Sequence, residues 1–142
     1  MSVEDAARSW FALNQARDFE GVRAMYAPDA IHARANGTSS GVDEIVAHLK
    51  GLKASFPDHA AVITDVFVAD DAAIVEWTET GSHTIPYDTG ASGVIAPTGR
   101  SFSAKIVDIF RFESGLIVSQ REYFDRLALL TDLGWIETSY RA

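Results

Sequence analysis

The spacing of apolar residues changes at Pro57, and this change constrains the fold more than any other feature of the chain. Before Pro57, apolar residues recur every three or four positions, which predicts helices over residues 3–11, from about 18 to 28, and over 42–56. After it, β-branched and aromatic residues dominate four segments, at 61–68, 73–84, 101–112 and 116–124. Helices first and antiparallel strands afterwards predict an α+β fold, with three helices packed on a sheet in one domain spanning residues 1–142.

Turn signals divide the second half of the chain into two hairpins and a long loop. Asp70-Asp71 separates the first pair of predicted strands, and Glu113-Ser114-Gly115 separates the second pair. Between the pairs, residues 85–100 contain two prolines and three glycines, which predicts a loop of a length that often carries function. We also expect an extended piece at 30–33, a polar loop at 36–41 and a short closing helix at about 126–133.

The composition argues against several classes of protein. Twenty acidic against twelve basic side chains give a formal charge of −8, so a nucleic-acid partner is not expected. The chain has no cysteine, and therefore no disulfide or thiolate nucleophile. It shows no phosphate-binding fingerprint, no signal-peptide pattern and no apolar stretch of the roughly 20 residues that span a membrane. We expect a cytoplasmic protein without a cofactor, a metal or a membrane partner.

Strand periodicity places acids among large apolar side chains. Because side chains two apart in a strand point to the same face, three sets each share a face: Trp77, Glu79, Gly81 and His83; Ile106, Asp108, Phe110 and Phe112; and Val118, Gln120, Glu122 and Phe124. Burial raises the pKa of a carboxyl group toward the range in which it exchanges protons near neutral pH. Asp108 and Glu122 are therefore candidate acid–base residues. The alternative for each is a structural carboxylate held by a salt bridge or a hydrogen bond.

The four histidines show no spacing typical of metal ligands. His32 follows the second predicted helix and His83 ends a strand, and pocket walls tend to form at such positions. These two are the histidines that we expect near a ligand. His48, on the third helix, and His59, next to Pro57-Asp58, are expected to face solvent.

A series of short sequence tags, in their order along the chain, resembles the SnoaL-like polyketide cyclases of the nuclear transport factor 2-like superfamily. The tags are Tyr26-Ala27-Pro28-Asp29-Ala30, Phe56-Pro57-Asp58, Glu76-Trp77-Thr78, Gly81-Ser82-His83, Pro97-Thr98-Gly99-Arg100, Asp108-Ile109-Phe110-Arg111-Phe112 and Glu122-Tyr123-Phe124-Asp125-Arg126-Leu127. The resemblance implies a cone-shaped barrel, in which helices close the mouth and a strongly curved, mainly antiparallel sheet surrounds an apolar pocket. Relatives of this fold, such as limonene epoxide hydrolase and ketosteroid isomerase, use carboxylate acid–base chemistry without a cofactor.

The resemblance also implies roles for single residues. Glu122 is similar in position to the acid on the last strand, which is an aspartate in limonene epoxide hydrolase, and Asp108 stands where the cyclases have a histidine. Glu79 falls near the second pocket acid of the hydrolase, whose arginine two residues earlier is replaced here by Trp77. Two acids facing one pocket repel each other, which raises one pKa and lets the pair share a proton.

The leading interpretation is a cofactor-independent acid–base enzyme, a cyclase, isomerase or dehydratase acting on a small apolar carbonyl compound such as a polyketide intermediate. Its expected catalytic residues are Glu122, Asp108 and His32. Its expected substrate contacts are Trp77, Glu79, His83, Tyr26, Gln120, Phe110 and Trp10. Two alternatives remain, a non-catalytic small-molecule binding protein with the same pocket and an epoxide hydrolase. A homodimer through the outer face of the sheet, at Val107, Ile109 and Tyr123, is compatible with each.

Overall fold

The computed structural model describes residues 1–137 and 139. Helices α1 (Val3–Gln15) and α2 (Phe19–Ala24) come first, followed by the strands β1 (Tyr26–Arg34) and β2 (Gly37–Ser40) and by helix α3 (Val42–Ser55). The long strands are β3 (Ala60–Ala69), β4 (Ala72–Ser82), β7 (Ser101–Glu113) and β8 (Leu116–Phe124), and a short helix, α4 (Arg126–Asp132), follows them. The α+β fold class predicted from the change in periodicity is confirmed.

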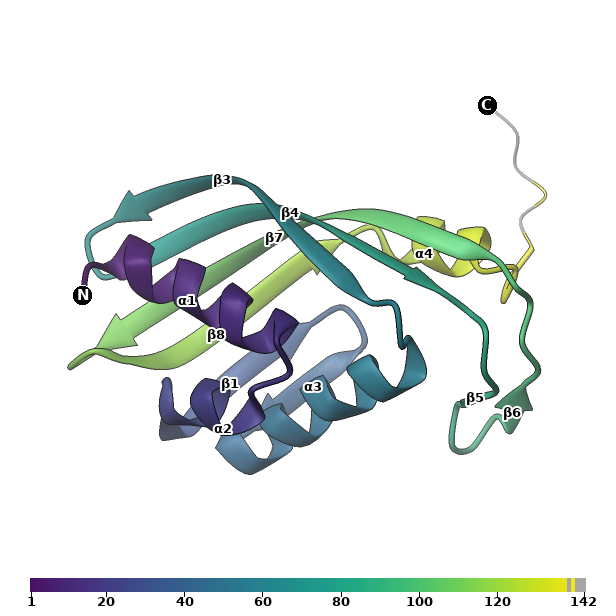
Figure 1. The fold of residues 1–142 in the computed structure, drawn as a ribbon, viewed down its shortest axis with the longest axis horizontal. Helices are drawn as coiled ribbons and strands as arrows, with labels where there is room; N and C mark the ends of the chain where they lie inside the picture. The colour runs from purple at the N-terminus through teal and green to yellow at the C-terminus, as the bar shows by residue number, and fades with distance from the viewer. Residues whose placement is uncertain (138, 140–142) are drawn as a thin grey trace.

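The main sheet is curved and is covered by helices on its concave face (Figure 1). It has six strands in the order β2-β1-β8-β7-β4-β3, and all neighbours are antiparallel except β1 and β8, which are parallel. Helix α1 packs against β3 and β4, α3 packs against β1 and β2, and α4 lies against β7 at the other end of the sheet. None of the helices in the described part of the chain has the length and apolar character needed to cross a membrane.

The second helix is shorter than predicted, because the chain leaves it to join the sheet. Helix α2 ends at Ala24 rather than at Pro28, and the backbone N–H of Ile117 on β8 donates a hydrogen bond of 2.8 Å to the carbonyl of Met25. Pro28 lies inside β1, in the irregular stretch where the pairing with β8 shifts. A proline is tolerated there because its missing N–H is not required by the strand pairing.

Two predicted loops contain strands. The polar loop at 36–41 includes β2, which pairs with β1 from Ser40 to Gly37. The long loop at 85–100 contains the short strands β5 (Tyr87–Asp88) and β6 (Val94–Ile95), which pair with each other. Neither region gives an alternation of apolar side chains, which is the signal that predicts a strand. Strand β2 consists of glycine, serine and threonine, and β5 and β6 are only two residues long.

A β-bulge changes the inner face of the last strand. Phe112 on β7 pairs with Ile117, whereas Arg111 pairs with Ser119, so Val118 is the extra residue. Ile117 is fully buried and Val118 only partly, which corrects the prediction that Val118 shares a face with Gln120 and Glu122. Strict alternation cannot anticipate one inserted residue.

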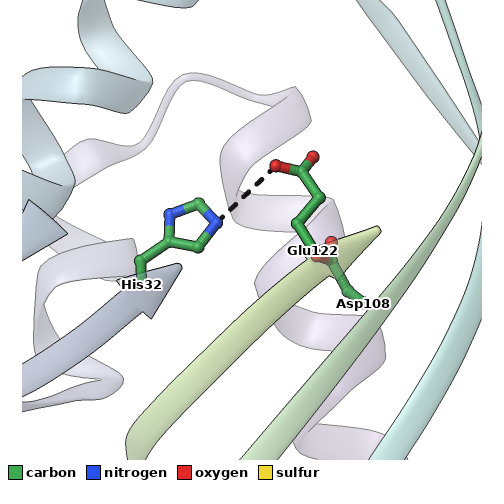
Figure 2. A group of neighbouring side chains, drawn as sticks. All are labelled: His32, Asp108 and Glu122. Atoms are coloured by element: carbon green, nitrogen blue, oxygen red, sulfur yellow. Dashed lines mark ion pairs between the residues drawn. The ribbon is translucent and has the colours of Figure 1, made fainter. Parts of the chain in front are cut away.

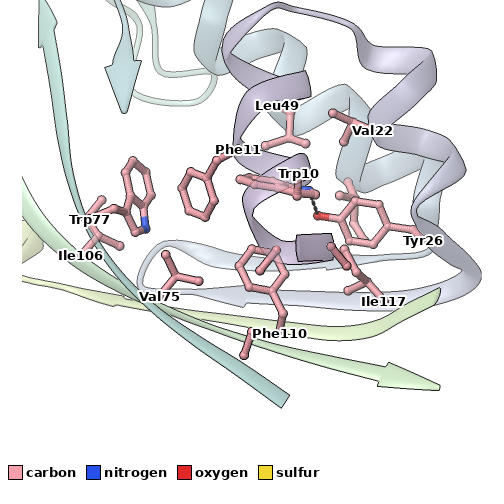
Figure 3. Close-up of a cluster of buried hydrophobic side chains, with 14 of the residues drawn as sticks. Trp10, Phe11, Val22, Tyr26, Leu49, Val75, Trp77, Ile106, Phe110 and Ile117 are labelled. Atoms are coloured by element: carbon pink, nitrogen blue, oxygen red, sulfur yellow. Dashed lines mark hydrogen bonds between the residues drawn. The ribbon is translucent and has the colours of Figure 1, made fainter. Parts of the chain in front are cut away.

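Aromatic side chains from α1 and from the sheet form the centre of the core (Figure 3). Trp10 contacts Phe110, and Phe11 contacts both Phe110 and Trp77, with ring centroids 5.2 to 6.1 Å apart. The indole Nε1 of Trp10 donates a hydrogen bond of 2.8 Å to the hydroxyl of Tyr26, which donates in turn to Oε1 of Gln120. This chain of hydrogen bonds links α1, β1 and β8.

Candidate active site

Three polar side chains meet on the concave face of the sheet (Figure 2). Asp108 on β7 and Glu122 on β8 are directly opposite each other in the strand pairing, so their side chains share one face. His32 on β1 pairs with Gln120 and points toward Glu122, with 3.7 Å between His32 Nε2 and Glu122 Oε2. One side-chain nitrogen or oxygen from each of the three lies within 4.8 Å of the other two. The structure thus brings the three expected catalytic residues together.

Asp108 is buried, with 1% of its surface exposed. Trp77 Nε1 donates a hydrogen bond of 3.1 Å to Oδ2, whereas Oδ1 has no hydrogen-bond partner among the described residues. Burial raises the pKa of Asp108 well above its ordinary value of 3.8, and repulsion by Glu122 raises it further. The hydrogen bond from Trp77 opposes this shift without cancelling it. Asp108 therefore favours its neutral, protonated form.

Glu122 is the more accessible of the two acids. Its side chain is 13% exposed, whereas that of His32 is 3% exposed. Neither ring nitrogen of His32 makes a hydrogen bond to any residue that the structure describes. A molecule that enters from solvent would therefore meet Glu122 before it met the other two side chains.

A second group of titratable side chains comes from α3, β4 and the turn before β3, and only one of its members, Glu79, was predicted to lie near a ligand. Lys53 Nζ lies 2.8 Å from His59 Nδ1, and His59 Nε2 lies 3.5 Å from Glu79 Oε1. All three residues are buried, with 3% to 6% of their surface exposed. The expectation that His59 faces solvent is wrong, because its backbone N–H donates to the carbonyl of Phe56 in a turn that directs the ring inward.

Both groups, except for Lys53, line an inner chamber with a volume of about 20 Å³. The lining residues are Trp10, Asn14, His32, His48, Leu49, Leu52, His59, Trp77, Glu79, Asp108, Gln120 and Glu122. A volume of this size holds about one water molecule or one substrate oxygen. Many of the buried polar atoms without a hydrogen-bond partner among the described residues belong to this lining, namely Asn14 Oδ1, both His32 nitrogens, His59 Nε2 and Asp108 Oδ1.

A wider outer pocket of about 100 Å³ adjoins the inner chamber. It is lined by Arg34, Asn36, His48, Leu52, Phe56, Glu79, Tyr87, Phe102, Glu122, Phe124, Arg126, Leu129, Leu130 and Trp135. Four residues, His48, Leu52, Glu79 and Glu122, line both spaces and therefore form the boundary between them. Most of the outer lining is apolar or aromatic, and the acids lie at its inner end.

His48 lines both cavities, which corrects the expectation that it faces solvent. Burial lowers the pKa of His48 to about 4 from 6.5, and the positive charge of Arg34 lowers it as well. The ring is therefore neutral at physiological pH. The inward position of His48 could have been predicted from the sequence. His48 follows Ile45 by three positions and precedes Leu52 by four, which places it on the apolar face of α3.

Three of the predicted substrate contacts, Tyr26, Phe110 and His83, do not line either cavity. Tyr26 and Phe110 lie in the core, where Tyr26 is engaged by Trp10. His83 is fully buried, and its Nδ1 accepts hydrogen bonds of 3.1 Å from Trp135 Nε1 and from the backbone N–H of Thr98. These hydrogen bonds join His83 to the loop after β4 and to Trp135. The other predicted contacts, Trp10, Trp77, Glu79 and Gln120, all line the inner chamber.

His32, Asp108 and Glu122 are also residue types that can bind a metal ion, and they lie close together. Nitrogen and oxygen ligands about 2.1 Å from a zinc ion stand roughly 3 to 3.5 Å apart. The three side chains here are spread over distances of up to 4.8 Å, so they would have to move closer before they could bind one ion.

A curved sheet with helices on its concave face, enclosing a chamber with paired acids, defines a protein of the nuclear transport factor 2-like fold. The comparison with family models is more specific: the SnoaL-like polyketide cyclase family matches residues 4–133, and the chain belongs to this family. The predicted family is confirmed. Among curated proteins, no sequence matches the chain at a significant level.

Several solved structures share the fold. IdmH from Streptomyces antibioticus, described as a candidate polyketide cyclase, is 24% identical with a TM-score of 0.80, and the match covers 94% of this chain and 99% of that one. AclR from Streptomyces galilaeus, described as a candidate hydroxylase, is 22% identical with a TM-score of 0.79, covering 95% and 97%. A candidate SnoaL-like polyketide cyclase from Jannaschia sp. CCS1 is 22% identical with a TM-score of 0.82, covering 95% and 93%.

Proposed function

We propose that the protein is a cofactor-independent acid–base enzyme that moves a proton on a small carbonyl compound, in a cyclisation, an isomerisation or a dehydration. The observation that carries this proposal is the buried Asp108 opposite Glu122 at the wall of a cavity. Because burial favours protonated Asp108, the pair would hold one negative charge, which Glu122 presents to the cavity. Membership of the SnoaL-like polyketide cyclase family supports an activity of this kind.

In the proposed reaction, a carboxylate oxygen of Glu122 takes a proton from the carbon next to the substrate carbonyl. The C–H bond breaks, its electron pair forms the carbon–carbon double bond of an enolate, and the carbonyl π pair moves onto the oxygen. In an isomerisation, Glu122 then returns the proton to another carbon. In a cyclisation, the enolate carbon attacks a second carbonyl, whose π pair moves onto its own oxygen, and Glu122 gives its proton to the alkoxide that forms. A positioned acid–base group of this kind contributes roughly 10²–10⁴-fold to a rate.

The cavities suggest how a substrate would be oriented. The outer pocket offers Leu52, Phe56, Phe102, Phe124, Leu129 and Leu130 to an apolar body. The inner chamber, with its buried polar atoms, has room for one oxygen. We therefore place the apolar part of the substrate outside and its reacting carbonyl inside, with Glu122 at the boundary. His32, 3.7 Å from Glu122, acts as a positioning residue for that carboxylate.

Exchange of α-protons for deuterium tests the proposal without knowledge of the natural substrate. A panel of cyclic ketones and β-keto esters in D₂O is followed by proton NMR, with the wild type, Glu122→Gln and Glu76→Gln. Glu76 is an exposed acid on the outer face of β4 and is the matched control. We expect exchange with the wild type and Glu76→Gln, and a loss of roughly 10²–10⁴-fold with Glu122→Gln. Full activity of Glu122→Gln would refute the assignment.

The same panel separates the enzyme from its main alternative, a binding protein with the same pocket. A binding protein would hold panel members, as shown by shifts of the His32 and Glu122 resonances, without exchanging their α-protons. An epoxide hydrolase would act on limonene oxide or another small epoxide and leave the ketones unchanged.

We also propose a cytoplasmic homodimer formed through the outer face of the sheet. Val107 and Tyr123 are cross-strand partners on that face, Ile109 lies next to them on β7, and Tyr123 is 58% exposed. Sedimentation equilibrium of the wild type and of Tyr123→Asp tests this, because a charge at the centre of an apolar interface should produce monomers.

A further inference from the structure

Lys53 and His59 form a contact that the proposed reaction does not use. The ammonium nitrogen Nζ of Lys53, in the last turn of α3, lies 2.8 Å from Nδ1 of the His59 ring. Both residues have 3% of their surface exposed. Buried lysines are rare unless a partner satisfies them, and here the imidazole is the hydrogen-bond partner. The carbonyl end of α3 also favours a positive charge at this position.

The charge of Lys53 determines which nitrogen of His59 carries the proton. An ammonium group donates hydrogen bonds and cannot accept them, so Nδ1 of His59 must be the acceptor. A neutral imidazole whose Nδ1 accepts carries its hydrogen on Nε2. Burial lowers the pKa of Lys53 to about 8 from 10.5, with repulsion by Arg17 as a second cause, so the ammonium form still predominates at pH 7.

His59 lines the inner chamber, and its Nε2–H belongs to a buried ring. Nε2 makes no hydrogen bond to any residue that the structure describes. The nearest carboxylate oxygen, Glu79 Oε1, lies 3.5 Å away without the geometry of a hydrogen bond. A buried donor without a partner is costly, roughly 1–3 kcal/mol, and such groups are usually explained by a ligand or an ordered water.

The backbone around His59 is fixed by hydrogen bonds from three other segments. Its N–H donates to the carbonyl of Phe56 over 2.9 Å, and its carbonyl accepts from Gln15 Nε2 over 3.4 Å. The neighbouring Asp58 carboxylate accepts a hydrogen bond of 2.9 Å from the N–H of Ser82 on β4. A donor held this firmly is prepared for a negative charge that develops during a reaction, because it needs no reorganisation.

We propose that His59 is a second catalytic residue, whose Nε2–H donates a hydrogen bond to the carbonyl oxygen of the substrate and stabilises the enolate oxygen that forms there. Lys53 is its positioning residue, which fixes the tautomer and adds a positive charge behind the ring. The assignment rests on the proposed function and narrows the substrate to compounds whose carbonyl oxygen reaches the inner chamber while the adjacent C–H faces Glu122. No proton leaves His59 in this step, and the proton removed from carbon stays on Glu122.

The tautomer can be measured without any substrate. Long-range ¹H–¹⁵N correlation spectra of the ¹⁵N-labelled wild type at pH 7 should show His59 neutral, with its hydrogen on Nε2. In Lys53→Met, which keeps a long side chain but removes the donor, the ring should become a mixture of the two tautomers or gain a second proton. An Nδ1–H or doubly protonated ring in the wild type would overturn the proposal whatever the outcome of the activity assays.

Two substitutions of His59 test its role in the reaction by α-proton exchange. A glutamine places its side-chain N–H near the position of Nε2, whereas an asparagine places it near that of Nδ1. We expect His59→Asn to lose about 10²-fold or more in kcat, and His59→Gln to keep most of the activity. If Glu122→Gln is inactive while His59→Asn equals the wild type, the role of His59 is refuted and the proposed function stands. If the wild type exchanges no panel member, the proposed function fails, and the tautomer measurement alone decides whether the donor exists.

Discussion

The indole Nε1 of Trp77 donates a hydrogen bond of 3.1 Å to Oδ2 of Asp108, and this contact joins the aromatic core to the paired acids. Trp77 also packs on Phe11, so the position of the buried carboxyl depends on the packing of helix α1 against the sheet. The second oxygen of Asp108 remains available to the chamber. Core and site are therefore one continuous structure, and substitutions at their junction should affect stability and proton chemistry differently.

Replacing Trp77 by Phe removes the donor and leaves both Asp108 oxygens without a hydrogen bond from that side. Because the Trp77 hydrogen bond lowers the pKa of Asp108, its loss should raise that pKa further. We expect the free energy of unfolding to fall by about 1–3 kcal/mol, as measured by urea denaturation. A variant as stable as the wild type would indicate that the hydrogen bond is not formed.

Asp108→Asn should be at least as stable as the wild type at neutral pH. Above pH 3.8 the folded protein still holds a proton on Asp108, whereas the unfolded chain has lost it. The free energy of unfolding therefore falls as the pH rises from about 4 through the raised pKa of Asp108. Asparagine keeps an acceptor for Trp77 and removes this pH-dependent cost. Denaturant titrations of both proteins at pH 4.5 and pH 7.5 measure the difference. A stability gap that narrowed with rising pH would contradict the expectation.

His48 should make the protein sensitive to acid. Its pKa is about 4 in the folded state and 6.5 in the reference state, so the unfolded chain binds more protons between these values. The stability is fully present above pH 6.5 and is lost as the pH falls through 4, by at most about 3 kcal/mol for this residue. His48→Gln should flatten this part of the stability profile, and thermal unfolding between pH 4 and pH 7 is the measurement. An unchanged profile in the variant would exclude His48 as the cause.

Tyr26→Phe should reduce stability and leave catalysis unchanged. The hydroxyl connects Trp10 Nε1 to Gln120 Oε1, and its removal leaves two buried polar atoms without that partner. A loss of about 1–3 kcal/mol is expected. Because Tyr26 does not line either cavity, kcat for α-proton exchange at a temperature where the variant is folded should equal that of the wild type. A fall in kcat without a fall in stability would place Tyr26 in the site after all.

The parts of the fold that could be predicted from the sequence are those with a regular apolar period. The helix at 42–56 and the strand at 116–124 correspond closely to α3 and β8, and side-chain alternation placed Asp108 and Glu122 on the inner face. The bulge at Val118 was not predicted, because strict alternation cannot anticipate one inserted residue. Strand β2 was not predicted, because its residues give no alternation of apolar side chains.

The second group in the chamber was missed for a different physical reason. Lysine is almost never fully buried unless it is paired, and only the turn after α3 brings Lys53 and His59 together beside Glu79. No spacing along the chain encodes that contact. His48, in contrast, could have been recognised from its place on the apolar face of its helix.

The protonation state of Asp108 tests the account most directly. Titration of its side-chain ¹³C resonance in selectively labelled protein, from pH 3 to pH 9, follows this carboxyl group alone, and Asp108→Asn assigns the signal. The account predicts a titration midpoint well above the ordinary value of 3.8. Asp108 would then keep its proton at pH values at which an aspartate in an unfolded chain has lost it. A midpoint near 4 would mean that both acids are charged together, and it would contradict the proposed sharing of one negative charge between Asp108 and Glu122.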